Sequence, residues 1–266
     1  MSIHESAWPE GTPAWIDLMV PDPAAARAFY GSLFGWDFVV GGPETGFYAT
    51  ATLHGRAVAG IGAVMPDQAA APAAWMTYLA VDDDIVAVTG RAAAAGAHVL
   101  ADPMTVMGFG AMAVLADPTG AVVGLWQAGT HTGAQVVNEP GTLIWNEVMT
   151  RDAAAAQAFY GSVFGYTFGD MSAPGFVYAT VDLDGRTVAG VGELPASVPA
   201  DVPAAWSSYL AVADTDATVA AAVGLGATVV SEPTDSPYGR VATLRGPFGE
   251  TFLLMSTTEP SSPAPA

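Results

Sequence analysis

The sequence predicts an α+β protein of two tandem domains, each made of two β-α-β-β-β modules. The first observation is an internal repeat: residues 15–36, WIDLMVPDPAAARAFYGSLFGW, align without a gap to residues 145–166, WNEVMTRDAAAAQAFYGSVFGY. The second is that each repeat contains a strand-like run, an amphipathic helical stretch and then further strand-like runs, twice over. A period of about 130 residues suits tandem domains rather than a solenoid.

Each repeat is expected to begin with a half-buried strand. Alternation along the first of these strands places Trp15, Asp17 and Met19 on one face, and the intervening aliphatic side chains on the face that packs under the helix. The second repeat has Trp145 and Glu147 at the matching positions. An acid therefore recurs two residues after a tryptophan inside a strand.

A helix is expected directly after this strand. Asp22 is a suitable N-cap, Pro23 suits the first helical position, and Gly35 ends an apolar stripe that repeats at helical spacing. Residues 152–165 repeat this pattern, so a second helix of the same kind is expected there.

The rest of each repeat predicts hairpins and a second module. Gly55 and Gly185 stand where a tight hairpin turn requires positive φ. Strands that begin at Trp75 and Trp206 lead into an alanine-rich helix in each half, with Asp82 taken as the cap of the first. Two more strands follow, joined by a turn that contains Pro and Gly.

The chain of 266 residues has 52% hydrophobic residues, enough for two cores. We expect an N-terminal arm (1–13), a first domain (14–127), a linker (128–142), a second domain (143–256) and a disordered tail (257–266). Whether the modules pair within or between the halves is left open.

Charge and composition limit the partners. The seven basic residues are all Arg, against 26 acidic residues, and the formal charge of −19 disfavours nucleic acid and anionic membranes. No apolar run is long enough to span a membrane and no signal peptide is recognisable, so a cytoplasmic monomer or homodimer is expected. The chain has no Cys, which excludes disulfides and thiol chemistry.

Three motifs carry a family resemblance. They are Asp22 with AFYGSLFGW, Asp152 with AFYGSVFGY, and DPTG at residues 117–120. Together they resemble the vicinal oxygen chelate superfamily, which includes glyoxalase I, bleomycin-resistance proteins and extradiol dioxygenases. The resemblance covers residues 15–256 and looks most like the tandem actinobacterial type. It implies glyoxalase-like domains whose curled sheets enclose a cavity.

The metal ligands of this superfamily have no counterpart here. Metal-using members carry His or Glu on the first strand of a module, seven residues before the capping acid, and Glu on the last strand. The last-strand positions hold Gly124 and Leu253, and the first-strand positions hold Trp15, Trp75, Trp145 and Trp206. These side chains offer no metal ligand, so we expect neither a metal nor another cofactor. The four histidines (His4, His54, His98 and His131) are scattered and are expected on the surface or in structural roles.

The resemblance places the tryptophans and the two acids toward the cavity, where they would form an apolar, aromatic cup with a few polar groups. A Met-rich loop at residues 103–112 and its counterpart at 233–242 would add a pliable wall. The candidate ligand-binding residues are Trp15, Asp17, Trp75, Thr77, Met104, Met107, Phe109, Trp145, Glu147, Trp206, Ser208, Tyr238 and Arg240.

Three functions are compatible with this site. The first is metal-independent binding or sequestration of a flat hydrophobic natural product, such as an aromatic polyketide or antibiotic. The second is a cofactor-free enzyme of isomerase, cyclase or lyase type, with Asp17 or Glu147 as general acid or base, because burial raises a carboxyl pKa. The third is a non-catalytic interaction domain, which would show no defined ligand. A purely structural alternative for the four tryptophans is that they fill the cavity.

Overall fold

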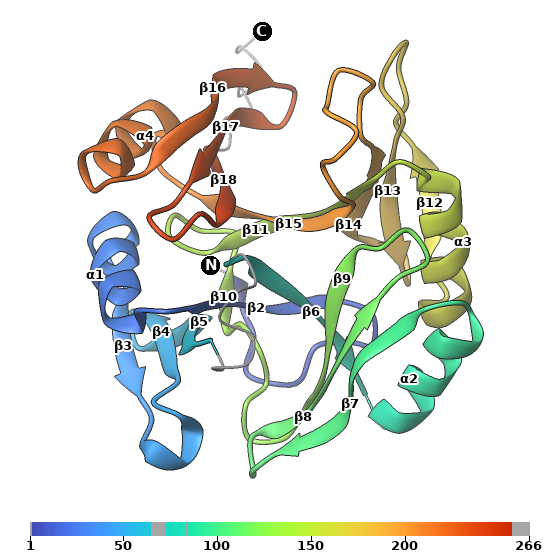
Figure 1. The fold of residues 1–266 in the computed structure, drawn as a ribbon, viewed down its shortest axis with the longest axis horizontal. Coiled ribbons are helices and arrows are strands. Elements are labelled where there is room, and N and C mark those ends of the chain that lie inside the picture. Colours follow the sequence, from blue (N-terminus) through green and yellow to red (C-terminus); the bar gives the residue numbers. More distant parts are fainter. Residues whose placement is uncertain (1, 65–72, 83, 257–266) are drawn as a thin grey trace, which may run out of the picture.

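The computed structural model describes residues 2–64, 73–82 and 84–256 (Figure 1). The tail expected at residues 257–266 lies outside this part of the chain. The fold consists of two eight-stranded mixed sheets and four helices, and the β-α-β-β-β order occurs four times, as the repeats predicted. No helix in the described residues is both long and apolar enough to cross a bilayer.

The first sheet is formed by the first half of the chain, in the order β3-β4-β5-β2-β6-β9-β8-β7. Its strands are β2 (Pro13–Val20), β3 (Asp37–Val40), β4 (Ala49–Leu53), β5 (Arg56–Ala63), β6 (Trp75–Val81), β7 (His98–Val106), β8 (Gly110–Ala116) and β9 (Val122–Ala128). A short 3₁₀ turn, Pro43–Thr45, precedes β4. The two modules join where β2 pairs antiparallel with β6.

The second sheet repeats this order with the second half of the chain, as β12-β13-β14-β11-β15-β18-β17-β16. Its strands are β11 (Leu143–Thr150), β12 (Thr167–Asp170), β13 (Tyr178–Leu183), β14 (Arg186–Glu193), β15 (Ala205–Ala211), β16 (Thr228–Ser236), β17 (Gly239–Arg245) and β18 (Thr251–Ser256). The arm and the linker form a separate two-stranded sheet, in which β1 (Ser2–Ile3) pairs with β10 (Val136–Val137). The strand hydrogen bonds that join modules are therefore formed between the two modules of the same half.

The helices begin and end at the expected kind of residue. In α1 (Pro23–Phe34) the Asp22 carboxylate accepts hydrogen bonds from the N–H groups of Ala24 and Ala25, and Gly35 at the C-terminus has φ +71°. The same design recurs in α3 (Ala153–Phe164). One cap differs from the prediction: Asp84, not Asp82, caps α2 (Ile85–Ala94), since its carboxylate accepts from the first free N–H groups.

The hydrophobic cores are shared between the halves. In Figure 1, α1 lies beside α4 (Thr215–Gly224) and α2 lies beside α3, although each pair joins different halves. One core combines Ile16, Leu18 and α1 with Phe252 and Leu254 of the second half. The other combines Leu79 and Leu115 of the first half with α3. Each sheet is therefore built by one half, but each core is completed by the other half.

Candidate functional site

The first half holds a buried carboxylate surrounded by aromatic hydrogen-bond donors. Asp17 accepts hydrogen bonds from the hydroxyls of Tyr48 (3.2 Å) and Tyr78 (3.3 Å). The Trp15 Nε1–H donates to the Tyr48 hydroxyl oxygen at 3.0 Å. Strand alternation explains the arrangement, because Trp15 and Asp17 share one face of β2, and Tyr78 lies opposite Trp15 on β6. We call these four residues the first carboxylate cluster.

The second half repeats the arrangement with a longer acid. Glu147 accepts hydrogen bonds from the hydroxyls of Tyr178 (2.7 Å) and Tyr209 (2.6 Å), and the Trp145 Nε1–H donates to the Tyr178 hydroxyl oxygen at 3.0 Å. We call these residues the second carboxylate cluster. The expectation that Trp15, Asp17, Trp145 and Glu147 share one face within each half agrees with this geometry, whereas their ligand-binding role stays a prediction.

Glycines on the neighbouring strands make room for the tyrosine rings. A Cβ at Gly60 would lie 1.7 Å from the Tyr48 hydroxyl oxygen, and one at Gly190 would lie 1.9 Å from that of Tyr178. A Cβ at Gly124 would lie 2.2 Å from the Tyr78 ring. Since real side chains do not approach this closely, a larger residue at these positions would displace the tyrosines. Gly124 is the position where the superfamily's last-strand Glu was expected, and Tyr78 now covers it.

Burial changes the protonation of the first cluster. Desolvation raises the pKa of Asp17 from 3.8 to about 7, although the two tyrosine hydrogen bonds act in the opposite direction. The same burial, together with the charge of Asp17, raises the pKa values of Tyr48 and Tyr78, so both phenols stay protonated and continue to donate. Asp17 can therefore exchange a proton near neutral pH.

Both halves expose large apolar side chains. In the first half these include Met19, Phe47, Met104, Met107 and Phe109, and in the second half Met171, Phe176 and Tyr238. Phe176 stacks on Tyr178 with ring centroids 5.4 Å apart. The Met-rich segment expected as a loop is instead the β7–β8 hairpin, and residues 233–242 form the β16–β17 hairpin. The strand pattern was hidden there by Pro and Gly, which are tolerated in edge strands.

Trp75 and Trp206 lie away from the carboxylate clusters, on the helix-facing side of their sheets. Trp75 donates from Nε1 to the Tyr30 hydroxyl oxygen at 3.1 Å, and Tyr30 donates to Glu250 at 2.6 Å. In the other core, Trp206 donates to Tyr160 and Tyr160 donates to Asp117. These chains tie one half to the other through buried groups, so both tryptophans are core residues here rather than walls of a cup.

Thr77 and Ser208 are also placed between the halves. Their hydroxyl oxygens lie 3.3 Å apart, and the Asn146 side-chain amide donates to each at 3.0 Å. All three are buried. The hydroxyls that were candidate ligand contacts are therefore satisfied by a polar contact between the two sheets.

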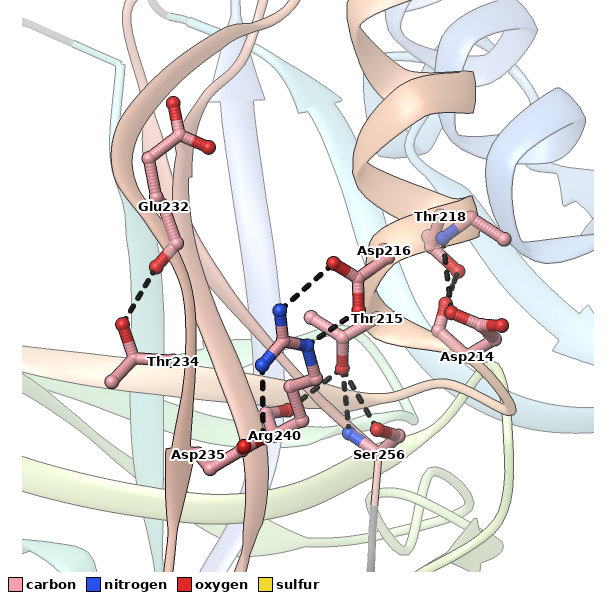
Figure 2. A network of polar contacts seen from close by, with 10 residues as sticks. Asp214, Thr215, Asp216, Thr218, Glu232, Thr234, Asp235, Arg240 and Ser256 are labelled. Carbon is pink, nitrogen blue, oxygen red and sulfur yellow. Dashed lines mark hydrogen bonds and ion pairs between the residues drawn. The ribbon is translucent and has the colours of Figure 1, made fainter.

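Arg240 faces helix α4. Its guanidinium donates to the Asp216 carboxylate at 3.0 Å and to Asp235 at 2.9 Å, as Figure 2 shows. The Thr215 hydroxyl donates to the Arg240 carbonyl oxygen at 2.7 Å and joins this network. The Arg240 side chain is therefore engaged in hydrogen bonds to acidic residues at the surface. Its neighbour Tyr238 is 61% exposed.

A metal ion, which related folds would imply, does not fit these donors. Each cluster offers one carboxylate, two protonated phenols and an indole N–H, of which only the carboxylate is a good ligand. In the described residues, no three His, Cys, Asp or Glu side chains gather in a possible metal-binding group. His131 is a neutral imidazole because desolvation lowers its pKa to about 4; it packs edge to face on Trp15 and belongs to no such group among the described residues.

Sequence reasoning missed the four tyrosines that complete the clusters: Tyr48, Tyr78, Tyr178 and Tyr209. A signal for them was present. Each pair occupies matching positions in the repeats, in the segments YATATL and YATVDL and in AWMTYLAV and AWSSYLAV. Each tyrosine occurs at the same position of both repeats, and so does the acid. This shared pattern would have indicated that the tyrosines contact the acid.

Comparison with known proteins agrees with this double-module fold. Residues 12–150 match the family model of the Glyoxalase/Bleomycin resistance protein/Dioxygenase superfamily, and residues 145–255 match a Glyoxalase-like domain. The chain belongs to this superfamily, as its motifs indicated.

Two relatives align over nearly the whole chain. CFP32 of Mycobacterium bovis is 44% identical over 258 residues, which cover 94% of this chain and 96% of that protein. The anthracycline biosynthesis protein DnrV of Streptomyces peucetius is 39% identical over 262 residues, which cover 94% of each.

Two solved structures share the fold. The Mn(II)-bound glyoxalase from Novosphingobium aromaticivorans has a TM-score of 0.63 at 18% identity, covering 94% of this chain and 84% of that one. The 2,2',3-trihydroxybiphenyl 1,2-dioxygenase from Sphingomonas wittichii has a TM-score of 0.63 at 14% identity, covering 93% and 91%. At these identities the likeness concerns the fold alone.

Proposed function

We propose that this protein binds a flat, hydrophobic natural product, such as an aromatic polyketide, at its carboxylate clusters without a metal. The observation that carries the proposal is the repeated buried acid, held by two tyrosine hydroxyls in a sheet whose edge hairpin exposes Met, Phe or Tyr side chains. Apolar walls with a few fixed polar groups are typical of small-molecule sites.

The chemistry of the donors fits such a ligand. Aromatic rings stack favourably on Phe and Tyr faces, and thioethers adapt to irregular flat surfaces. The carboxylate cluster supplies an acceptor that can receive a phenol or amide proton in an apolar setting, where a hydrogen bond is strengthened. The relative DnrV is named for anthracycline biosynthesis, and anthracyclines are flat polycyclic aromatics, which supports a role in cytoplasmic secondary metabolism or self-resistance.

The test is a retention experiment in buffer containing a chelator. Purified protein is incubated with a panel of aromatic natural products and separated by ultrafiltration, and retained and released compounds are identified by mass spectrometry. We expect a compound to be retained unchanged by the unmodified chain and lost from at least one of the variants Asp17→Asn and Glu147→Gln. The control is Asp37→Asn, which removes an exposed acid from β3. Retention that is equal in all four proteins would contradict the proposal.

A second candidate function is favoured by one observation, the pKa of Asp17 near 7. A carboxyl group with that pKa can accept a proton from one ligand atom and return it to another, which is the requirement for a cofactor-free isomerase or cyclase. In the same experiment, such an enzyme would release an isomer or a compound of new mass. Asp17→Asn would then stop conversion while the compound was still retained.

A further inference from the structure

We infer that only the second half takes the ligand, through a pocket between the N-terminal arm and the β13–β14 hairpin. This inference rests on the proposed function, because it assigns which of the two repeats is used. The pocket has a volume of about 570 Å³, within the range of small-molecule sites. Its lining includes Trp145, which links the pocket to the second carboxylate cluster through its bond to Tyr178.

The corresponding space in the first half is filled by the chain itself. The repeat equates Ile144, Trp145 and Thr187, which line the pocket, with Ala14, Trp15 and Ala57. In the first half those three positions are covered by linker residues, so the space that is open beside Trp145 is closed beside Trp15.

The closing contacts are specific. The Ala134 N–H donates to the Ala14 carbonyl oxygen at 2.7 Å. Gln135 makes a pair of bonds with the backbone of Ala57: its N–H donates to the Ala57 carbonyl oxygen at 2.7 Å, and its side-chain oxygen accepts from the Ala57 N–H at 2.9 Å. The His131 ring meets the Trp15 indole edge to face, with centroids 4.3 Å apart.

These contacts indicate what the open pocket recognises. A ligand that replaces the linker needs a ring that packs against Trp145, and a donor and an acceptor that reach the backbone of Thr187. A planar aromatic compound with a carboxamide meets both requirements, because the amide supplies donor and acceptor together. The arm adds a further aromatic wall: His4 stacks on Trp8 with centroids 3.7 Å apart.

The polarity of the pocket agrees with this class of ligand. Asp184 and Arg186, at the β13–β14 turn, lie in the lining beside Thr187. The Nδ1 atom of His4 is buried and has no hydrogen-bond partner in the described part of the chain. Asp184 and Arg186 are therefore the charged side chains that the pocket offers to a polar substituent of the ligand.

The test uses anthraquinone-2-carboxamide as the probe and titration calorimetry on the full chain. Thr187→Trp fills the pocket from an exposed strand position, and Thr251→Trp makes the same change at an exposed position of β18 outside the pocket lining. We expect one probe per chain, affinity lowered about 100-fold or more in Thr187→Trp, and unchanged affinity in Thr251→Trp. The methyl ester of the same ring, which lacks the N–H, should bind about tenfold more weakly.

Three results would overturn the inference. Two probes per chain would mean that the first half is also open. Full affinity in Thr187→Trp together with loss in Glu147→Gln would place the ligand elsewhere on the second cluster, and the proposed function would stand without this pocket. Failure of the probe to bind the unmodified chain would count against both. The stoichiometry and the comparison of amide with ester use unmodified protein, so they hold even if a variant misfolds.

Discussion

Replacing Asp17 by Asn should make the protein more stable at alkaline pH and change its stability little at acidic pH. The folded chain raises the pKa of Asp17 from 3.8 to about 7, so between these values the folded state holds a proton that the unfolded state has released. The stabilisation from this proton is complete below the unfolded pKa and is lost as the pH rises through 7. Asn carries no such proton and can still form hydrogen bonds with the two tyrosines.

The size of the effect follows from the same shift. At 1.36 kcal/mol for each pH unit, the difference between 3.8 and about 7 corresponds to about 4 kcal/mol, of which about 3 kcal/mol falls between pH 5 and pH 8. The free energy of unfolding should be measured by urea titration at both pH values for the unmodified chain and for Asp17→Asn. We expect the difference between the two proteins to move by about 3 kcal/mol in favour of the variant as the pH rises.

Asp37→Asn is the matched control, because it removes an exposed acid from the same sheet and reports the effect of net charge alone. The reasoning would be refuted if the difference between Asp17→Asn and the unmodified chain changed by less than about 1 kcal/mol between pH 5 and pH 8. It would also be refuted if Asp37→Asn showed the same pH dependence.

Three further predictions concern the supports of the site. Gly190→Ala should cost about 1–3 kcal/mol of stability in urea titration and abolish probe binding, because the new Cβ would collide with the Tyr178 hydroxyl. Gly90→Ala in α2, whose Cβ meets nothing within 4 Å, should instead be neutral or stabilising, and equal losses in both would contradict the packing argument. Tyr160→Phe should cost about 1–3 kcal/mol, since Asp117 and Trp206 lose a buried partner; an unchanged urea midpoint would contradict this. Because the cores are shared, urea unfolding followed by near-UV circular dichroism and by fluorescence should show one coincident transition, and two separated transitions would contradict shared cores.

Much of the fold could be predicted because its signals are local. The Asp22 cap, the Gly35 stop and the Gly55 turn each depend on the conformation of a few neighbouring residues, and all three occur as expected. The internal repeat then fixed the order of the modules. How the halves pack could not be read in this way, because pairing α1 with α4 rather than with α2 depends on contacts between distant segments.

The face of β6 shows why the site was harder to predict. Strand faces alternate, so a change of one residue in the connection to the helix reverses which side chains face the cluster. Trp15 stands seven residues before its cap Asp22, whereas Tyr78, which lies opposite it, stands six before Asp84. Counting seven residues back from Asp82, the expected cap, gave Trp75, whose side chain lies in the core. Seven residues back from the actual cap Asp84 is Thr77, which alternation places on the same face of β6 as Trp75.

Asp17 and Glu147 could be recognised as unusual from the sequence because an acid in a half-buried strand needs partners. Their partners come from other strands: Tyr78 lies opposite through the β2–β6 register, and Tyr48 fits only because Gly60 leaves space beside it. That information resides in strand pairing and packing rather than in residue spacing.

The most direct test of metal-independent ligand binding is the dissociation constant of anthraquinone-2-carboxamide, measured on chelator-treated protein before and after adding Mn²⁺ or Zn²⁺. A site built from tyrosine-held carboxylates predicts the same dissociation constant, within about twofold, in all three conditions. Binding that appears only when a metal is added would contradict the account, because the ligand would then require a metal centre that the carboxylate clusters do not provide.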